Sequence, residues 1–419
     1  MAAVTDLAAP SPRRSPLVVR TVPVDDPGPL LALLPRDDNV AWVHHTDGIV
    51  GWGRAAAITP SGADRFAEAE EWWRDLADHA VVRDEVGQPG TGLVAFGSFA
   101  FADSPGDSTL VVPNVIVGRR GSTHWVTTIS SGSLAAPPVL RDHRADRPAE
   151  VAFADGSMSG AEWELVVADG VRRIQAGDLD KVVLARDLVA AIPERLDVRW
   201  PLQRLAERYA ACWTFHVDGL FGASPEMLVR RERGLLTSRV LAGTIRRTGD
   251  DTHDLALAAS LARSSKDLEE HEYAVRSVAD ALAPHCTSMN VPESPFVLHL
   301  PNVMHLATDV AGVIDDSTTA LGLAAALHPS AAVGGTPTDA AVDLIAQIEG
   351  MDRGRYAGPV GWIDGNGDGE WCIALRSAKI EAEQIRLYAG CGIVADSDPA
   401  AELAESQAKL LPVRDALTD

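Results

Sequence analysis

Cysteine is scarce in this chain: the 419 residues include four, Cys212, Cys286, Cys372 and Cys391. No two of them form a CxxC pair, and their spacing matches no common zinc motif. The sequence therefore predicts neither a disulfide framework nor a zinc site. We expect buried or free thiols in a reducing compartment.

Long apolar runs are also missing. The first twenty residues contain Pro10, Arg13, Arg14 and Pro16 but no apolar segment of the kind that signal peptides carry. No stretch approaches the roughly 20 apolar residues that a membrane-spanning helix needs. We therefore expect a cytoplasmic protein with no membrane partner.

Positive charge is in deficit. Lys and Arg together number 37 against 59 Asp and Glu, which gives a formal net charge of -22. A field of this sign repels phosphate backbones, so we expect no nucleic-acid partner. A small anionic substrate would need a metal ion or a local basic cluster to bind here. Since there are no coiled-coil heptads, we expect a monomer.

The composition predicts a large folded unit. Hydrophobic residues make up 46% of the chain, which is an ordinary value for a globular protein. We expect residues 1–18 to form a flexible tail and residues 19–419 to form a single domain. Strand-like runs interrupted by single helices indicate α+β packing rather than a regular βαβ repeat.

Local signals place some elements directly. A helix is expected over residues 63–79. Ser159 and Glu162 form a capping-box pattern, which predicts the start of a second helix. The β-branched run 181–186 predicts a strand.

The later part of the chain contains longer patterns. We expect one long helix over residues 254–282 and one strand over residues 370–378. A last helix is expected to begin at Pro399. Pro412 lies within that helix, and an interior proline removes a hydrogen bond, so we expect the helix to end or bend near Leu411.

Two of these predicted helices carry spaced carboxylates. Asp267 and Glu270 lie three residues apart and so share a face. Glu402, Glu405 and Lys409 form a single stripe on the last helix. Each stripe alone is more typical of a solvated helix face. Together they could supply the oxygen ligands that Mg²⁺ prefers.

Lys181 and Glu226 are unusual because each borders an apolar run. A lysine at the start of a strand most often extends its ammonium to water. A desolvated lysine can instead act as a general base. Glu226 is a candidate for a carboxyl group that stays protonated and acts as a general acid.

A series of short motifs covers roughly residues 157–415. They are Lys181–Arg186, Gly222–Glu226, Leu241–Thr244, Lys266–His271, His305–Leu306, His328–Pro337, Arg353–Trp362, Ala374–Arg376, Tyr388–Ala395 and Ser397–Pro399 with Glu402, Glu405 and Lys409. In content and order these motifs resemble one known family, the chorismate-utilising enzymes, whereas the N-terminal third resembles the family only loosely.

The resemblance implies a fold and a set of roles. The expected fold is one large domain with two stacked, mainly antiparallel β-sheets wrapped by helices, as in anthranilate synthase component I. Lys181 would be the general base and Glu226 the general acid. Mg²⁺ would be held by Glu270 and Glu405, with Asp267 and Glu402 beside them. The substrate, chorismate, would be bound by Thr244, His305, Tyr356, Arg376, Gly390, Gly392 and Lys409.

Within the family, the sequence is most like isochorismate synthases. Members that add ammonia, such as anthranilate synthase component I, usually have Gln where Lys181 stands, so Lys181 favours water as the nucleophile. Salicylate synthase, which forms isochorismate and then eliminates pyruvate, remains an alternative. A non-catalytic relative that binds chorismate is another. The residues leave open whether the product leads to menaquinone or to a siderophore.

Overall fold

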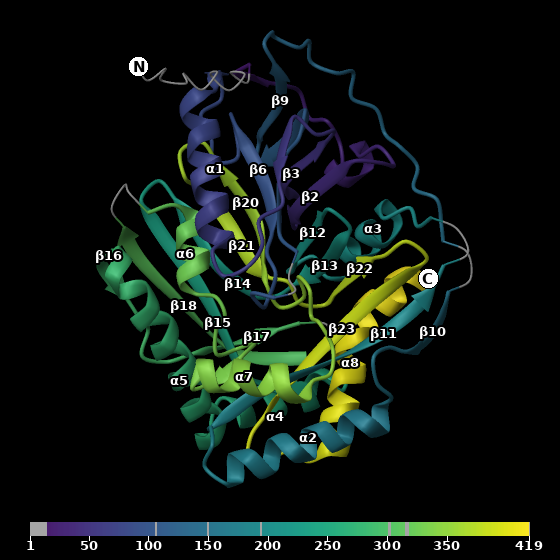
Figure 1. The fold of residues 1–419 in the computed structure, drawn as a ribbon, viewed down its shortest axis with the longest axis vertical. Coiled ribbons are helices and arrows are strands. Elements are labelled where there is room, and N and C mark those ends of the chain that lie inside the picture. Colours follow the sequence, from purple (N-terminus) through teal and green to yellow (C-terminus); the bar gives the residue numbers. More distant parts are fainter. Residues whose placement is uncertain are drawn as a thin grey trace, which may run out of the picture.

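Two β-sheets form the centre of the structure, and helices surround them (Figure 1). The structure is a computed structural model, and it describes residues 15–104, 107–148, 151–192, 195–300, 303–314 and 318–418, without the side chains of Lys266 and Glu270. Among these residues, β1 and β5 pair in parallel and the other strand pairs are antiparallel.

The larger sheet combines strands from both ends of the chain. Its order is β10 (Ala152–Asp155), β11 (Lys181–Ala191), β23 (Gln384–Ile393), β22 (Ser377–Ile380), β13 (Leu220–Ser224), β12 (Trp213–Val217), β2 (Asn39–His44), β3 (Asp47–Trp52), β8 (Val115–Arg120), β9 (Thr123–Ser131), β1 (Leu17–Pro23) and β5 (Val81–Asp84). A short strand, β19 (Gly335–Thr336), pairs with the start of β11.

The smaller sheet is built in the same interleaved way. Its order is β16 (Cys286–Asn290), β18 (Val303–Ile314), β15 (Leu235–Arg246), β14 (Met227–Glu232), β21 (Gly369–Ile373), β20 (Pro359–Asp364), β6 (Val94–Ser98), β7 (Thr109–Val112) and β4 (Ala56–Ile58), and β17 (Phe296–His299) pairs with β18.

The two sheets face each other across a shared apolar core. Trp42 and Phe215 of the larger sheet belong to the same buried cluster as Phe96 and Trp371 of the smaller one. Polar contacts also join the sheets: the indole N–H of Trp42 donates to Glu370 at 2.8 Å, and Arg120 donates to Glu232 at 2.7 Å. Stacked sheets bury the inner face of each, which is what this core requires.

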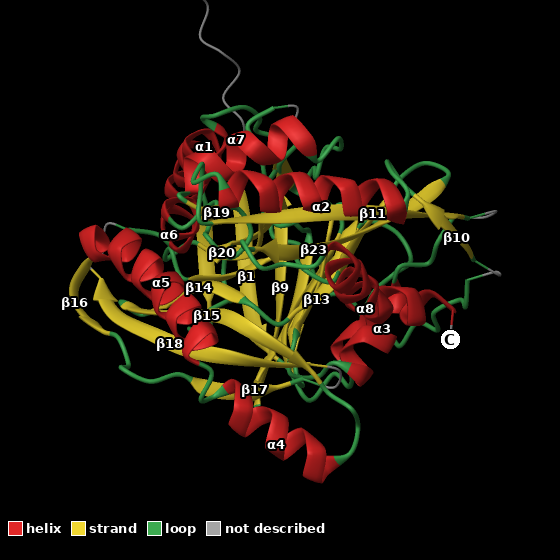
Figure 2. Ribbon diagram, turned by 90° about the horizontal axis from the view of Figure 1, so that it is seen from below, coloured by secondary structure: helices red, strands yellow, loops and turns green. Residues whose placement is uncertain are grey.

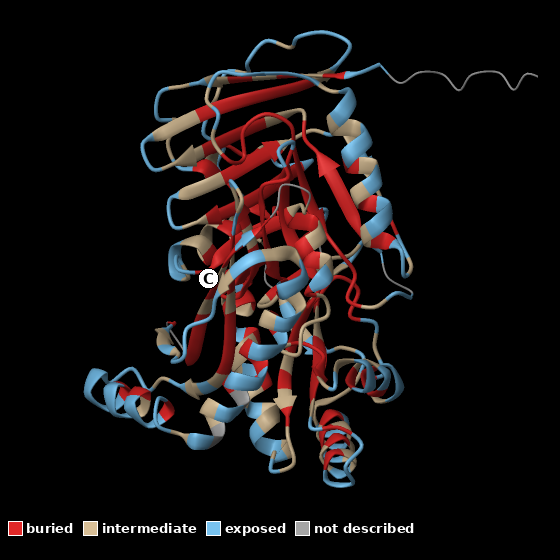
Figure 3. Ribbon diagram, turned by 90° about the vertical axis from the view of Figure 1, so that its left-hand side faces the viewer, coloured by how far each residue is buried: buried red, intermediate tan, exposed pale blue. Residues whose placement is uncertain are grey.

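Helices cover the outer faces and ends of the sheets (Figure 2). They are α1 (Arg65–His79), α2 (Gly160–Gln175), α3 (Arg199–Arg208), α4 (Asp251–Leu261), α5 (Ser265–Leu282), α6 (Ala320–Ala326), α7 (Thr338–Ile348) and α8 (Pro399–Thr418), with 3₁₀ turns at Leu30–Leu33 and Ala283–His285. Burial follows this layering, because much of the strands is buried and the helices expose their outer sides (Figure 3). This architecture confirms the expected α+β fold, and none of the described helices is long and apolar enough to span a membrane.

Some local predictions are confirmed. The helix expected over 63–79 is α1, and the expected capping box at α2 is present, with the Ser159 side chain accepting from the Glu162 N–H and Glu162 accepting in return. The strand expected at 181–186 is the first half of β11. Leu17 and Val18, which were expected in the tail, belong to β1.

The prediction of one long helix over 254–282 is wrong, because the chain breaks between α4 and α5. Ser264 is extended, and its side chain accepts a hydrogen bond from the N–H of Asp267 at 3.3 Å. That is an N-cap, so a new helix begins there. The break contains no Gly or Pro, the residues that usually mark a helix end in a sequence.

The prediction of one strand over 370–378 is also wrong. The segment forms β21 in the smaller sheet and β22 in the larger one. Arg376 lies at the crossing with a φ of 48°, in the left-handed region that non-glycine residues rarely adopt. The chain therefore changes sheets at a predicted substrate-binding residue.

Helix α8 does not end at Leu411, in contrast to the expectation from Pro412. It continues to Thr418, with Pro412 inside it. Leu410, Val413 and Leu417 are each 1% exposed and pack in the core under α3 and β23. We infer that this packing outweighs the hydrogen bond that the proline removes.

Candidate active site

A cavity of about 520 Å³ lies where the two sheets and α8 meet. Strands β11 and β23 of the larger sheet and strands β15 and β18 of the smaller one contribute side chains to its wall. Every predicted site residue whose side chain the structure describes lines this cavity: Lys181, Glu226, Thr244, Asp267, His305, Tyr356, Arg376, Gly390, Gly392, Glu402, Glu405 and Lys409. The side chain of Glu270 lies outside the described residues.

Lys181 is placed by the start of β11. In the adjacent strand β23, Gly392 lies opposite Val183 and Gly390 opposite Ala185. A Cβ atom on Gly392 would lie 3.0 Å from Cε and 3.5 Å from Nζ of Lys181. The Lys181 side chain therefore extends directly over Gly392, and only glycine leaves it that room.

Glu226 lies between β13 and β14 and also lines the cavity. Its N–H donates to the Ser224 hydroxyl at 3.2 Å, which fixes the turn through Pro225. The residue is 7% exposed, and burial raises the pKa of its carboxyl to about 7, although Lys181, Lys409 and Arg376 pull it down. The carboxyl group therefore retains its proton in a substantial fraction of molecules near neutral pH.

Cationic groups gather near the glycines of β23. The ammonium of Lys409 donates to the Gly390 carbonyl at 2.9 Å. Amide and carbonyl of a strand residue point to the same edge, so the N–H groups of Gly390 and Gly392 also point to this side. No carboxylate of the described residues forms a salt bridge with Arg376, so its guanidinium is available to an anionic ligand.

Tyr356 lies beside Gly390 in the same part of the cavity wall. It is 4% exposed and stacks on Tyr388 with ring centroids 5.1 Å apart. Burial raises the pKa of Tyr356 to about 12, so its hydroxyl is protonated and can donate. The hydroxyl lies against Gly390, where an added Cβ would be 3.1 Å away.

Thr244 and His305 face each other across β15 and β18. The Thr244 hydroxyl and His305 Nδ1 share a hydrogen bond of 2.9 Å, just beyond a bulge at Gly243. Burial, with repulsion from Arg376 and Lys409, lowers the pKa of His305 to about 3, so the ring is neutral. Its Nε2 atom is buried and has no hydrogen-bond partner among the described residues, which suits a ligand contact.

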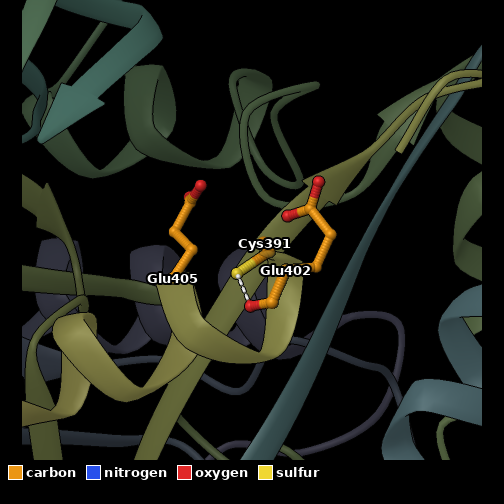
Figure 4. Close-up of side chains that lie close together, drawn as sticks. All are labelled: Cys391, Glu402 and Glu405. Carbon is orange, nitrogen blue, oxygen red and sulfur yellow. Dashed lines mark hydrogen bonds between the residues drawn. The ribbon is translucent and has the colours of Figure 1, made fainter. Parts of the chain in front are cut away.

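Carboxylates from α8 form the candidate metal site. Ligand atoms of Glu402, Glu405 and Cys391 lie within 4.8 Å of one another. Figure 4 shows both Glu side chains extending from one side of the helix, while the Cys391 thiol turns back to the Glu402 carbonyl, 3.4 Å away. Burial raises the pKa of Cys391 to about 12, so it is a protonated thiol and a poor ligand.

The oxygen donors at this site fit Mg²⁺. Burial alone would raise the pKa of Glu405, but the Lys409 ammonium, 2.6 Å away, outweighs it and lowers the pKa. Glu405 is therefore ionised. Asp267 lines the same cavity from α5. A few carboxylates with open positions for water and substrate oxygens are what Mg²⁺ requires.

Two further residues, Ser397 and Arg353, line the cavity, although the sequence did not identify them as site residues. Ser397 donates to the Glu402 carboxylate at 2.8 Å and so orients it. Arg353, which is 3% exposed, lines the cavity next to Tyr356. Both occur within motifs that were recognised, but no spacing rule separates them from their neighbours.

The fold and the cavity together define a class of protein, in which a lysine, a buried carboxyl group and a cluster of carboxylates surround a pocket large enough for a small molecule. The family model described as "Chorismate binding enzyme" matches residues 13–418. This chain belongs to that family, and within it is most like the isochorismate synthases.

Three proteins illustrate the likeness. The "Salicylate biosynthesis isochorismate synthase" of Pseudomonas aeruginosa is 35% identical over 97% of this chain and 91% of its own length. The crystal structure of the DhbC protein of Bacillus anthracis is 32% identical, with a TM-score of 0.77 over 93% of this chain and 98% of that one. MenF, the menaquinone-specific isochorismate synthase of Escherichia coli, is 25% identical, with a TM-score of 0.76 over 96% and 95%.

Proposed function

We propose that this chain is an isochorismate synthase, an isomerase that reversibly converts chorismate to isochorismate with the help of Mg²⁺. The observation that carries the proposal is the pairing of Lys181 with Glu226 in one cavity, where burial raises the pKa of the carboxyl to about 7. General acid–base chemistry at neutral pH needs such a pair. The cytoplasmic location and the monomeric state expected from the sequence belong to the same proposal.

The cavity offers chorismate, a dianion, a cationic and hydrogen-bonding wall. Arg376 and Lys409 supply charge, and the protonated Tyr356 hydroxyl supplies a donor. The N–H groups of Gly390 and Gly392 can approach a carboxylate closely because no Cβ intervenes. These groups reverse the local sign of a protein whose net charge is -22.

The metal would be held by Glu405 and Glu270, with Glu402 and Asp267 beside them. When bound there, Mg²⁺ would neutralise and orient the ring carboxylate of the substrate. Ser397 keeps the Glu402 carboxylate in place through its 2.8 Å hydrogen bond.

The proton transfers follow from the two sides of the cavity. Lys181 takes a proton from a water molecule, whose oxygen bonds to C2 of the ring. The ring double bonds shift, the C4–O bond breaks, and Glu226 donates its proton to the departing hydroxyl, which leaves as water. Neutral His305, held by Thr244, lines the pocket and offers Nε2 to the substrate.

Product analysis tests the proposal. The purified protein is incubated with chorismate and Mg²⁺, with a parallel sample in EDTA, and the products are separated by chromatography. Isochorismate in equilibrium with chorismate, formed only with Mg²⁺, is the expected result. Salicylate with an equal amount of pyruvate would instead indicate a salicylate synthase, and no conversion would contradict an enzymatic role on chorismate.

A variant pair tests the assigned base. Lys181→Ala should lose activity by at least about 100-fold. Lys379→Ala removes a lysine that pairs with Asp107 at 3.1 Å outside the cavity, and it should leave the rate unchanged. A Lys181→Ala enzyme that retains the parental rate would exclude Lys181 as the base.

A further inference from the structure

A buried ion pair lies at the wall of the cavity, where Arg353 belongs to the lining and Glu349 lies behind it, apart from the acid, base and metal groups. Glu349 at the end of α7 is fully buried, and Arg353 is 3% exposed. Their side chains meet at 2.5 and 2.7 Å in a bidentate arrangement. Burying two charges is costly unless their remaining hydrogen bonds are also satisfied, so the partners of this pair are informative.

The partners are backbone groups of β11, at a place where this strand lacks a neighbour. On this edge, β19 pairs with Lys181 and Val182, and β10 pairs with residues 188–191. Between them, Glu349 accepts from the N–H of Ala185 at 2.8 Å, and Arg353 donates to the carbonyl of Val183 at 2.7 Å. The two side chains thus make the ladder bonds that a strand would make.

The surrounding bonds complete this substitute edge. The N–H of Val183 donates to the Gly334 carbonyl at 2.8 Å, and the Trp163 indole donates to the Ala185 carbonyl at 3.0 Å. The opposite edge of β11 pairs with β23, which carries the glycines under Lys181 and Lys409. If β11 lost its bonds to Glu349 and Arg353 and shifted, Lys181 would therefore move relative to these glycines and Lys409.

Arg353 also bonds to two further segments that line the cavity, at Val333 and Tyr356. It donates to the carbonyl of Val333, which lines the cavity, at 2.9 Å. Its own carbonyl accepts from the N–H of Tyr356 at 3.0 Å, in the turn that presents the tyrosine to the cavity. The lining segments at 183 and 333 thus meet at the Arg353 guanidinium, and Tyr356 is bonded to the backbone of the same residue.

We propose that Glu349 and Arg353 are positioning residues, which hold the strand of the base, the Val333 loop and Tyr356 in register around the substrate. They replace a missing strand with a charged pair, whose geometry is more restrictive than that of a neutral contact. The inference deepens the proposed function and rests on it for its kinetic part. Neither residue touches the reacting atoms, so the pair acts through the backbone.

Two substitutions separate positioning from stability. Glu349→Gln keeps the shape of the side chain and removes its charge. Arg353→Lys keeps the charge and removes the planar fork that reaches two carbonyls and a carboxylate at once. The matched control is Asp197→Asn, which breaks another buried pair, 2.6 Å from Arg199 at the start of α3 and outside the cavity wall.

The readouts are melting temperature, kcat and KM for chorismate with saturating Mg²⁺, and amide hydrogen exchange of the 181–187 segment. All three variants should melt at lower temperature. Only Glu349→Gln and Arg353→Lys should speed exchange of 181–187 and lower kcat of the folded enzyme, by about 10- to 100-fold, because small misplacements of reacting groups are costly. KM should change less than about threefold, since Glu349 and the guanidinium of Arg353 bond to each other and to backbone carbonyl and N–H groups of the protein.

The contrary results are distinct. Parental kcat in the two variants, whether exchange of 181–187 changes or not, would overturn the positioning role and leave a structural ion pair. Exchange no faster than in Asp197→Asn would overturn the role of the pair in holding β11. A parent enzyme without activity on chorismate would refute the proposed function, and the exchange comparison alone would then decide whether the pair holds the strand.

Discussion

Two buried carboxyl groups in different regions of the molecule have the same pKa for the same reason. Burial raises the pKa of Glu226, in the cavity, and of Asp364, in the turn between β20 and β21, to about 7 in each case. Their partners differ. Asp364 accepts N–H bonds from Gly90, Asn366 and Asp368 at 2.9 to 3.2 Å. The Glu226 carboxyl forms no hydrogen bond with the described residues and borders the cavity.

The comparison shows that a raised pKa does not by itself identify a catalytic acid. The carboxyl group of Asp364 already accepts three backbone hydrogen bonds, so its burial stabilises the turn. Glu226 has unused capacity and space in front of it, so its proton is available to a ligand. Substitutions at the two carboxyl groups should therefore differ strongly in their effect on activity.

Removing the cavity acid should have the largest effect. Glu226→Gln preserves the shape but has no proton to donate, and kcat for chorismate should fall about 1,000-fold. The melting temperature should not fall, because the substitution removes a buried group that would otherwise ionise. Steady-state kinetics and calorimetry measure the two quantities. A large loss of stability would instead place Glu226 with Asp364 as a structural group.

The pH dependence should follow the same acid. Because Glu226 must be protonated, kcat/KM should decline above about pH 7, by up to tenfold per pH unit. The folded pKa lies above the unfolded value, so the stability that this group contributes is present at low pH and is lost as pH rises through about 7. A rate profile that stays flat from pH 6 to pH 9 would contradict the assigned acid.

A smaller effect is expected from the glycine beneath the base. In Gly392→Ala, the new Cβ would lie 3.0 Å from Cε of Lys181, so the lysine must shift by a few tenths of an ångström. We expect kcat to fall about fivefold. Gly170→Ala is the control, because its Cβ would be equally tight against Leu184, at 3.2 Å, but outside the cavity. Equal rates in both variants would mean that the position of Lys181 is not critical.

The smallest effect on activity should come from the structural carboxyl. Asp364→Asn places an amide NH₂ near backbone N–H donors and loses at least one of three hydrogen bonds, which should destabilise the fold by about 1–3 kcal/mol. The kcat of the folded enzyme should stay within about twofold of the parent. Chemical denaturation measures the free energy of unfolding, and steady-state kinetics at 20 °C below the melting point measure kcat. A loss of kcat as large as that in Glu226→Gln would mean that Asp364 and Glu226 do not differ in role.

The parts of the structure that follow local rules were predictable. The capping box of Ser159 and Glu162 is a local pattern, and α2 begins where it indicates. The division at Ser264 was not predicted because no Gly or Pro marks it, although the Ser264 cap is itself local. The crossing at Arg376 was not predicted because it depends on the pairing of β21 with β14 and of β22 with β13, which lie far along the chain. Pro412 shows the same limit, since a local rule was overridden by burial of the surrounding helix.

The candidate site divides in the same way. The residue types of Lys181, Glu226 and the α8 carboxylates were identifiable from motifs, and the structure brings them to one cavity. The unpartnered Nε2 of His305 and the bonds of Arg353 to β11 were not, because both are three-dimensional relations between strands and loops. A motif identifies the residues of a site, whereas the fold determines which of their atoms already form hydrogen bonds within the protein.

The interleaved order of the sheets has a consequence for synthesis of the chain. Strand β6 pairs with β20, and Val94 lies opposite Asp364, which is synthesised much later. At ribosomal rates of about 5–20 residues per second, that partner emerges on the order of 15 to 50 seconds later. During this time the N-terminal strands expose unpaired edges, which favour association with other chains. Chaperones that cover these edges during synthesis should therefore raise the yield of the folded enzyme in a cell.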